Sequence, residues 1–237
     1  MEIQIAASKI DKFNSPNSGD TIEVVERPNG GVSVVLASGL FEEKSTKMVS
    51  YSVVKKVISL IADGVRDGAA ARAASDALFT QYNGKSISSL NILSADLQTD
   101  TLVLSCNSPT PVYLCRGDTI EKMSIECTLI GTGLDVKPSI SEIPIEPGLT
   151  VVAPSSGILK AGIEYGQLFD FYTSLSAILE EQQPTSNLIA DTLLNQAISV
   201  DQGQPNEDMS VVVVRIFPGF KNLIRRINVN IPFSELD

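Results

Sequence analysis

The order of hydrophobic and polar positions divides the chain into blocks of strands separated by two blocks of helices. Alternating and β-branched runs fill the first forty residues. Between two of them, Asn29-Gly30 predicts a β-hairpin, because Asn and Gly accept the positive φ angles of a tight turn. Strands are expected at residues 2–7, 21–26, 32–36, 87–97, 101–106, 112–116, 123–130, 139–145, 149–153, 210–216 and 223–233.

Apolar residues recur at helical spacing in four segments, which come in two pairs. The expected helices cover residues 51–61, 69–82, 166–182 and 184–199. Strands joined by hairpins form antiparallel sheets, and helices in two blocks form outer layers. The fold class predicted is therefore α+β: a four-layer αββα sandwich with two largely antiparallel sheets flanked by helix pairs. No linker interrupts the pattern, so residues 1–237 are expected to form a single domain.

The charge and the apolar runs exclude several classes of protein. The chain has 28 acidic and 18 basic side chains, a net charge of −10 and a pI of about 4.6. Nucleic acids and anionic membrane surfaces need clustered Lys and Arg, so neither is an expected partner. No apolar run is long enough to span a membrane, and the start of the chain does not resemble a secretory signal. A cytoplasmic protein is expected, with its three cysteines reduced.

Histidine is absent from the sequence. This absence excludes a Ser-His-Asp triad, a Cys-His dyad, a histidine general base and a histidine-ligated zinc ion. Any catalysis must therefore use carboxylates, hydroxyls, Lys, Arg, Cys or a metal ion held by oxygen atoms.

Four short segments stand out together, at residues 18–21 (SGDT), 35–39 (VLASG), 154–157 (PSSG) and 207–210 (EDMS), the last followed by four valines. In this order and spacing they resemble the metal-dependent protein phosphatase family, protein phosphatase 2C. The likeness is greater to its bacterial branch named for the sporulation stage II protein E. Residues 107–114 and 145–148 resemble further segments of that branch, and the likeness extends from about residue 19 to residue 216.

The resemblance implies a metal-dependent phosphatase that acts on phosphoserine or phosphothreonine. In the family, aspartates hold two Mg²⁺ or Mn²⁺ ions that activate a water molecule. Asp20 matches the first aspartate. Ser38 stands in place of the aspartate that bridges both ions, and Gly39 follows it as in the family. The remaining two ligand aspartates are replaced by Ser156 and by Glu207, which Asp208 follows.

These replacements leave two carboxylates where the family has four, against the four positive charges of two divalent ions. The resemblance therefore implies a pseudophosphatase or regulatory binding module of bacterial signalling, with its dinuclear site dismantled and no cofactor expected. Two alternatives stay open. Asp20, Glu207 and Asp208 could hold a single cation, or a rearranged site could give an active Mn²⁺- or Mg²⁺-dependent serine/threonine phosphatase.

The partners that the resemblance implies are small regulatory proteins, phosphorylated or not, of the anti-sigma antagonist or stressosome type. A second copy of the chain is a further expected partner, as a homodimer. Other polar motifs have simpler interpretations. Asp63 and Asp67 lie four residues apart and are expected on a solvated helix face, and Gly131-Thr132-Gly133 is expected to be a turn.

Overall fold

The computed structural model describes residues 1–15, 18–40, 46–123, 126–181, 183–219 and 224–232. Within these residues, ten strands form two antiparallel sheets of five. The first sheet has the order β1 (Glu2–Ile10), β10 (Met209–Phe217), β9 (Thr150–Pro154), β6 (Val112–Arg116) and β7 (Thr119–Met123). The second has the order β2 (Asp20–Glu26), β3 (Gly31–Leu40), β4 (Ile87–Asp96), β5 (Thr101–Asn107) and β8 (Ser139–Pro144).

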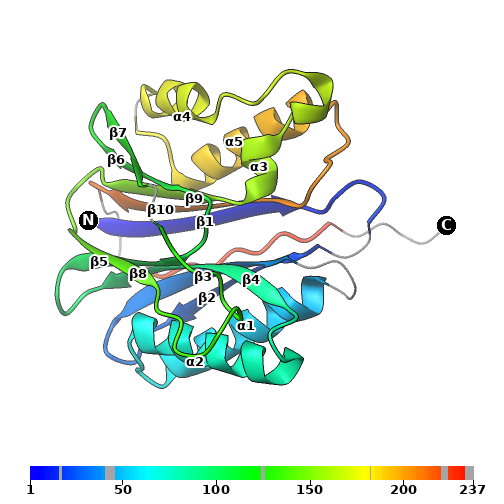
Figure 1. Ribbon diagram of the computed structural model, residues 1–237. Coiled ribbons are helices and arrows are strands. Elements are labelled where there is room, and N and C mark those ends of the chain that lie inside the picture. Colours follow the sequence, from blue (N-terminus) through cyan, green and yellow to red (C-terminus); the bar gives the residue numbers. More distant parts are fainter. Residues whose placement is uncertain (16–17, 41–45, 124–125, 182, 220–223, 233–237) are drawn as a thin grey trace.

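Helices cover the outer face of each sheet. Helices α1 (Thr46–Ala62) and α2 (Asp67–Tyr82) lie on the second sheet, while α3 (Ser156–Lys160), α4 (Phe171–Leu179) and α5 (Ser186–Val200) lie on the first. Figure 1 shows the resulting four layers, with the two sheets stacked between the helices. The predicted αββα sandwich is confirmed. No helix in the described part of the chain is long and apolar enough to cross a membrane.

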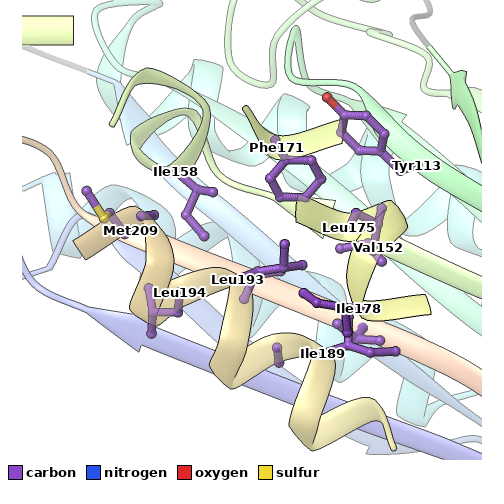
Figure 2. Packing of buried hydrophobic residues seen from close by; sticks show 14 of the residues in the cluster. Tyr113, Val152, Ile158, Phe171, Leu175, Ile178, Ile189, Leu193, Leu194 and Met209 are labelled. Atoms are coloured by element: carbon purple, nitrogen blue, oxygen red, sulfur yellow. The ribbon is translucent and has the colours of Figure 1, made fainter. Parts of the chain in front are cut away.

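Three apolar clusters correspond to the three interfaces between the four layers. The middle strand β10 shows why this arrangement suits its sequence: eight of its nine residues are buried, because one face meets the opposite sheet and the other meets helices. Figure 2 shows the cluster under α4 and α5, where Phe171 lies against Tyr113 with ring centroids 4.6 Å apart. A run of four valines fits such a position, because neither of its faces meets water.

The hairpin between β2 and β3 is confirmed, with one difference at its turn. The Arg27 N–H donates to the Gly31 carbonyl at 3.1 Å. Positive φ angles occur at Gly30 (92°) and Gly31 (100°) and not at Asn29, so the two glycines supply the left-handed conformations. Asn83, with φ of 51°, ends α2 as predicted.

Three expected elements differ from the structure. Helix α4 begins at Phe171 instead of residue 166, because the Asp170 side chain caps it by accepting from the Thr173 N–H at 3.0 Å. The strand expected at 123–130 is wrong in its described part: β7 ends at Met123, residues 124–125 lie outside the described residues, and only Ile130 makes an isolated bridge, with Ser88.

The strand expected at residues 223–233 is also wrong within the described range 224–232, where no strand forms. The alternating Ile227, Val229 and Ile231 are each more than 70% exposed. The segment makes a surface ion pair between Arg225 and Glu26 at 3.1 Å. A β-pattern in the sequence becomes a strand only when its backbone groups find a partner strand.

Asp67 was expected on a solvated helix face and is instead 5% exposed. One of its oxygens forms an ion pair with Arg27 Nη1 at 2.6 Å, and the same nitrogen lies 3.0 Å from the Ser33 hydroxyl and 3.2 Å from the Ser94 hydroxyl. The prediction failed because Arg27 is forty residues away in the sequence. Asp63, by contrast, is exposed as expected.

Candidate functional site

The four motif segments meet at one end of the sandwich. Asp20 begins β2 and is paired across the sheet with Ser38 of β3. In the opposite sheet, Ser155 follows the end of β9, and its N–H donates to the Ser210 carbonyl of β10 at 2.7 Å. The two sheets are joined here, because the Gly19 N–H donates to Asp208 Oδ2 at 2.6 Å. Residues far apart in the sequence are thus brought to a common site.

Asp20 is the most buried carboxylate of this site, with 3% of its surface exposed. Burial raises its pKa above the ordinary value of 3.8, and the Asp208 charge acts in the same direction. The hydroxyls of Ser38, Ser210 and Ser155 lower the pKa and only partly offset the burial. Its Oδ2 atom has no hydrogen-bond partner among the described residues. Burial therefore disfavours the charged form of Asp20, although the three hydroxyls favour it.

The carboxylate of Asp208 is occupied by main-chain donors. Its Oδ1 accepts from the Lys12 N–H at 2.9 Å, and its Oδ2 accepts from the Gly19 N–H. Lys12 and Gly19 flank the loop between β1 and β2, so Asp208 fastens this loop to the start of β10. Asp208 therefore has a structural role.

Glu207 points to a different set of partners. Its Oε2 accepts from the Ser156 hydroxyl at 3.2 Å, and its Oε1 forms an ion pair with Lys160 at 2.8 Å. Ser156 and Lys160 are the first and last residues of α3, and the side chains of Lys160 and Glu207 are about half exposed. A surface ion pair of this kind contributes at most about 1 kcal/mol to the free energy of unfolding. It nevertheless offsets the negative charge of Glu207 with the positive charge of Lys160.

The two serines that the resemblance places at ligand-aspartate positions, Ser38 and Ser156, line a small cavity of about 30 Å³ between the ends of the sheets. Its lining carries no ionisable side chain. Asn91 contributes a buried amide whose Oδ1 has no described hydrogen-bond partner. The hydroxyls around the cavity belong to Ser38, Ser89, Ser108, Thr110, Ser155 and Ser156.

Both retained glycines are required by close packing. A Cβ atom at Gly39 would collide with the main chain of Thr46, and one at Gly157 would collide with the main chain of Asp208. These contacts hold α1 against β3 and α3 against the loop before β10. The glycines of the motifs therefore serve the scaffold even where the aspartates before them are absent.

A dinuclear metal centre needs several carboxylates that converge on one point, since hard cations take oxygen ligands and two of them bring four positive charges. In the described residues, no group of three or more Asp, Glu, Cys or His side chains is placed to hold a metal ion. Asp208 and Glu207 are bonded to other partners, and Asp20 is flanked by serines. The side chains present do not fit the dinuclear centre of the family.

Sequence reasoning missed the cations and hydroxyls around these positions. Lys9, Lys47 and Lys160 come from β1, α1 and α3, and each contacts the main chain of Asp20 or the side chain of Glu207. Ser155 and Ser210 lie within the motif segments 154–157 and 207–210, but nothing in the sequence singles out their hydroxyls. No local pattern marks the three lysines.

Comparisons with known proteins agree with the fold and the motifs. The sequence model of the family "Stage II sporulation protein E (SpoIIE)" matches residues 45–217. Stage II sporulation protein E of Bacillus subtilis is 23% identical over 200 residues, which cover 84% of this chain and 24% of that protein. The chain thus spans about a quarter of the length of that relative.

Two solved structures are similar over most of the chain. The PP2C phosphatase domain of SpoIIE from Bacillus subtilis, solved with a fragment of its regulatory domain, superposes with a TM-score of 0.75 at 20% identity, over 91% of this chain and 64% of that chain. The catalytic domain of the serine/threonine protein phosphatase PstP, in complex with two manganese ions, gives a TM-score of 0.72 at 16% identity, over 91% and 98% of the two chains. The family match covers most of the chain, and the fold is shared with these phosphatase domains. The chain therefore belongs to the stage II sporulation protein E family and forms a domain of the protein phosphatase 2C type.

Proposed function

We propose that this protein is a pseudophosphatase: a protein phosphatase 2C-like domain that binds a regulatory protein without hydrolysing a phosphate ester. The observation that supports this proposal is that two of the remaining carboxylates already bind groups of the protein itself. Both oxygens of Asp208 accept main-chain N–H groups, and Glu207 is paired with Lys160. A metal ion would have to compete with the Lys160 ammonium for Glu207, and each Asp208 oxygen would have to bind it while already accepting a main-chain hydrogen bond.

The magnitude of the loss also supports the proposal. Removing one residue that merely supports a metal ligand already lowers metal affinity about 10–100-fold. Here two ligand positions, Ser38 and Ser156, carry neutral hydroxyls, and the carboxylate of Asp20 is held where burial raises its pKa. Two divalent cations would therefore meet too little negative charge to stay close together.

The partner class comes from the family resemblance. Small regulatory proteins of the anti-sigma antagonist or stressosome type, phosphorylated or not, are the proposed ligands, and a second copy of the chain is the other candidate. Cytoplasmic signalling in a bacterium is the proposed setting.

A direct test is an activity assay with para-nitrophenyl phosphate and with a phosphoserine peptide, each in millimolar Mn²⁺. The expected rate is close to background for the parent and unchanged in Asp20→Ala, which controls for contaminating phosphatase. A robust Mn²⁺-dependent rate that Asp20→Ala abolishes would overturn the proposal in favour of an active phosphatase with a rearranged metal site.

A second test restores the missing ligands with Ser38→Asp, Ser156→Asp and Glu207→Asp in one variant. Without metal, the added carboxylates should repel Asp20 and lower the free energy of unfolding by about 1–3 kcal/mol. Millimolar Mn²⁺ should recover that loss, because an ion that binds only the folded state stabilises it. Thermal melts of parent and variant in EDTA and in Mn²⁺ measure both effects, and equal metal responses in the two proteins would contradict the placement of these residues around one site.

A further inference from the structure

The tail of the chain, residues 224–232, combines the pattern of a β-strand with an exposed surface. It lies beyond residue 217, where the family match ends, and it belongs to neither sheet (Figure 1). Its apolar residues Ile227, Val229 and Ile231 alternate with asparagines and are mostly exposed. Apolar side chains at every second position suit one face of a sheet. The tail therefore has the pattern of a strand that joins no sheet of its own chain.

Strand β2 presents an edge that can accept a further strand. It is the first strand of the second sheet and pairs with β3 on one side only. The Arg27 N–H donates to the Gly31 carbonyl, so alternation along the strand turns the backbone groups of Ile22 and Val24 away from β3. No hydrogen bond between described residues occupies these outward groups. Such an edge is a template for pairing with another strand.

The tail and the β2 edge carry opposite charges. Strand β2 contains Asp20, Glu23 and Glu26 and no basic residue, whereas the tail contains Arg225 and Arg226 and no acidic residue. The Arg225 guanidinium lies 3.1 Å from the Glu26 carboxylate. Opposite charges on neighbouring strands favour their pairing. The ion pair also shows that the start of the tail can approach the end of β2.

This contact sets the register in which the two segments match. Because Glu26 is the last residue of β2, only the antiparallel direction lays the rest of the tail along the strand. Ile227 then lies opposite Val24, whose side chain is 45% exposed. Val229 lies opposite Ile22, which packs against the apolar cluster between the two sheets. The apolar face of the tail thus extends the apolar layer between the sheets.

We propose that the tail of one copy pairs with the β2 edge of a second copy, so that two copies exchange their tails in a symmetric dimer. Within one chain, the tail reaches β2 through Arg225 and still joins no sheet, which favours an edge on another molecule. Each copy has one tail and one such edge, so a twofold axis satisfies both contacts. The basic tail also offsets part of the repulsion between two chains of net charge −10. This inference rests on the proposed function only in taking up its second-copy candidate.

The first test mixes two full-length variants, Val24→Cys and Ile227→Cys, which carry tags of different mass. Mild oxidation should join them in a disulfide-linked heterodimer on a non-reducing gel, because opposite residues of paired strands have Cα atoms about 5.5 Å apart. The control replaces the first variant by Ile140→Cys, which lies on the opposite edge strand β8 and should give no heterodimer. Equal cross-linking of the control would overturn the inference. A double variant that forms the disulfide only within monomers would overturn it too, since the tail would then pair with its own β2.

The second test measures the dimer dissociation constant by analytical ultracentrifugation. Val229→Pro removes an N–H that faces β2 in the dimer and should raise the constant at least tenfold, whereas Asn228→Pro removes one that faces solvent and should leave it unchanged. Arg225→Glu should raise it about tenfold, and adding Glu26→Arg to the same chain should restore it. Circular dichroism verifies that each variant is folded.

The outcomes of this test separate the inference from the proposed function. A parent protein that stays monomeric up to about 100 µM, or a dimer that none of these substitutions weakens, would overturn the inference alone. Mn²⁺-dependent turnover of a phosphate ester would overturn the proposed function and leave the tail exchange standing.

Discussion

Replacing Asp20 by asparagine removes an ionisable group from a buried position without changing its shape. Asp20 is 3% exposed, and its Oδ2 atom has no hydrogen-bond partner among the described residues. Asparagine keeps the polar atoms of the side chain but has no charge to desolvate, and desolvation of the charged form is the largest cause of the raised pKa of Asp20. We therefore expect Asp20→Asn to raise the free energy of unfolding at neutral pH by about 1–3 kcal/mol. Each kcal/mol corresponds to a rise in Tm of about 2–4 °C for a domain of this size.

The direction of the effect follows from how the stability of each protein depends on pH. Because burial raises the pKa of Asp20 above 3.8, the folded state binds more protons than the unfolded state between 3.8 and the raised pKa. The parent must therefore lose stability from this group as pH rises through that window, and Asp20→Asn must not. The stability difference between the two proteins should be small below pH 3.8 and should grow to its full value above the folded-state pKa.

The assay is urea unfolding of both proteins in EDTA at a series of pH values, followed by circular dichroism. Asp118→Asn is the control, because Asp118 lies in the exposed turn between β6 and β7. A loss of stability in Asp20→Asn at neutral pH would refute the reasoning, since it would show that the ionised carboxylate is stabilised in the fold. A difference that is constant with pH would refute it as well.

Three further predictions concern the scaffold. Asp67→Ala should lower the free energy of unfolding by about 3–5 kcal/mol in urea denaturation, because it leaves the largely buried Arg27 guanidinium without its partner; a loss below 1 kcal/mol would show that water reaches the pair. Gly157→Ala should cost about 1–3 kcal/mol in the same measurement, since its Cβ collides with the main chain of Asp208, and an unchanged midpoint would contradict that contact. Cys127 should react first with a thiol reagent at pH 8, because the other two cysteines are buried and their pKa is raised to about 12; equal labelling of all three in the native state would contradict their burial.

Local patterns in the sequence determined much of the fold. The β-branched runs, the turn around Gly30 and the helical spacing of apolar residues in two blocks predicted the two-sheet sandwich, because each pattern reports which faces of an element meet water. The positions of the family motifs also located Asp20 and Ser38 as neighbours, since both fall at the ends of strands joined by a hairpin. Element boundaries were less reliable, and the start of α4 depended on a cap by Asp170 that the apolar pattern does not show.

The tertiary structure alone decided what surrounds each of these positions. The burial of Asp67 depends on Arg27, and the meeting of Lys9 with Lys47 depends on how β1 and α1 pack beside β2. The tail at 224–232 has the alternation of a strand, but it joins neither sheet. Sequence fixes the intrinsic preference of each segment, but charge compensation and strand pairing are relations between distant residues, and only packing brings those residues within reach of one another.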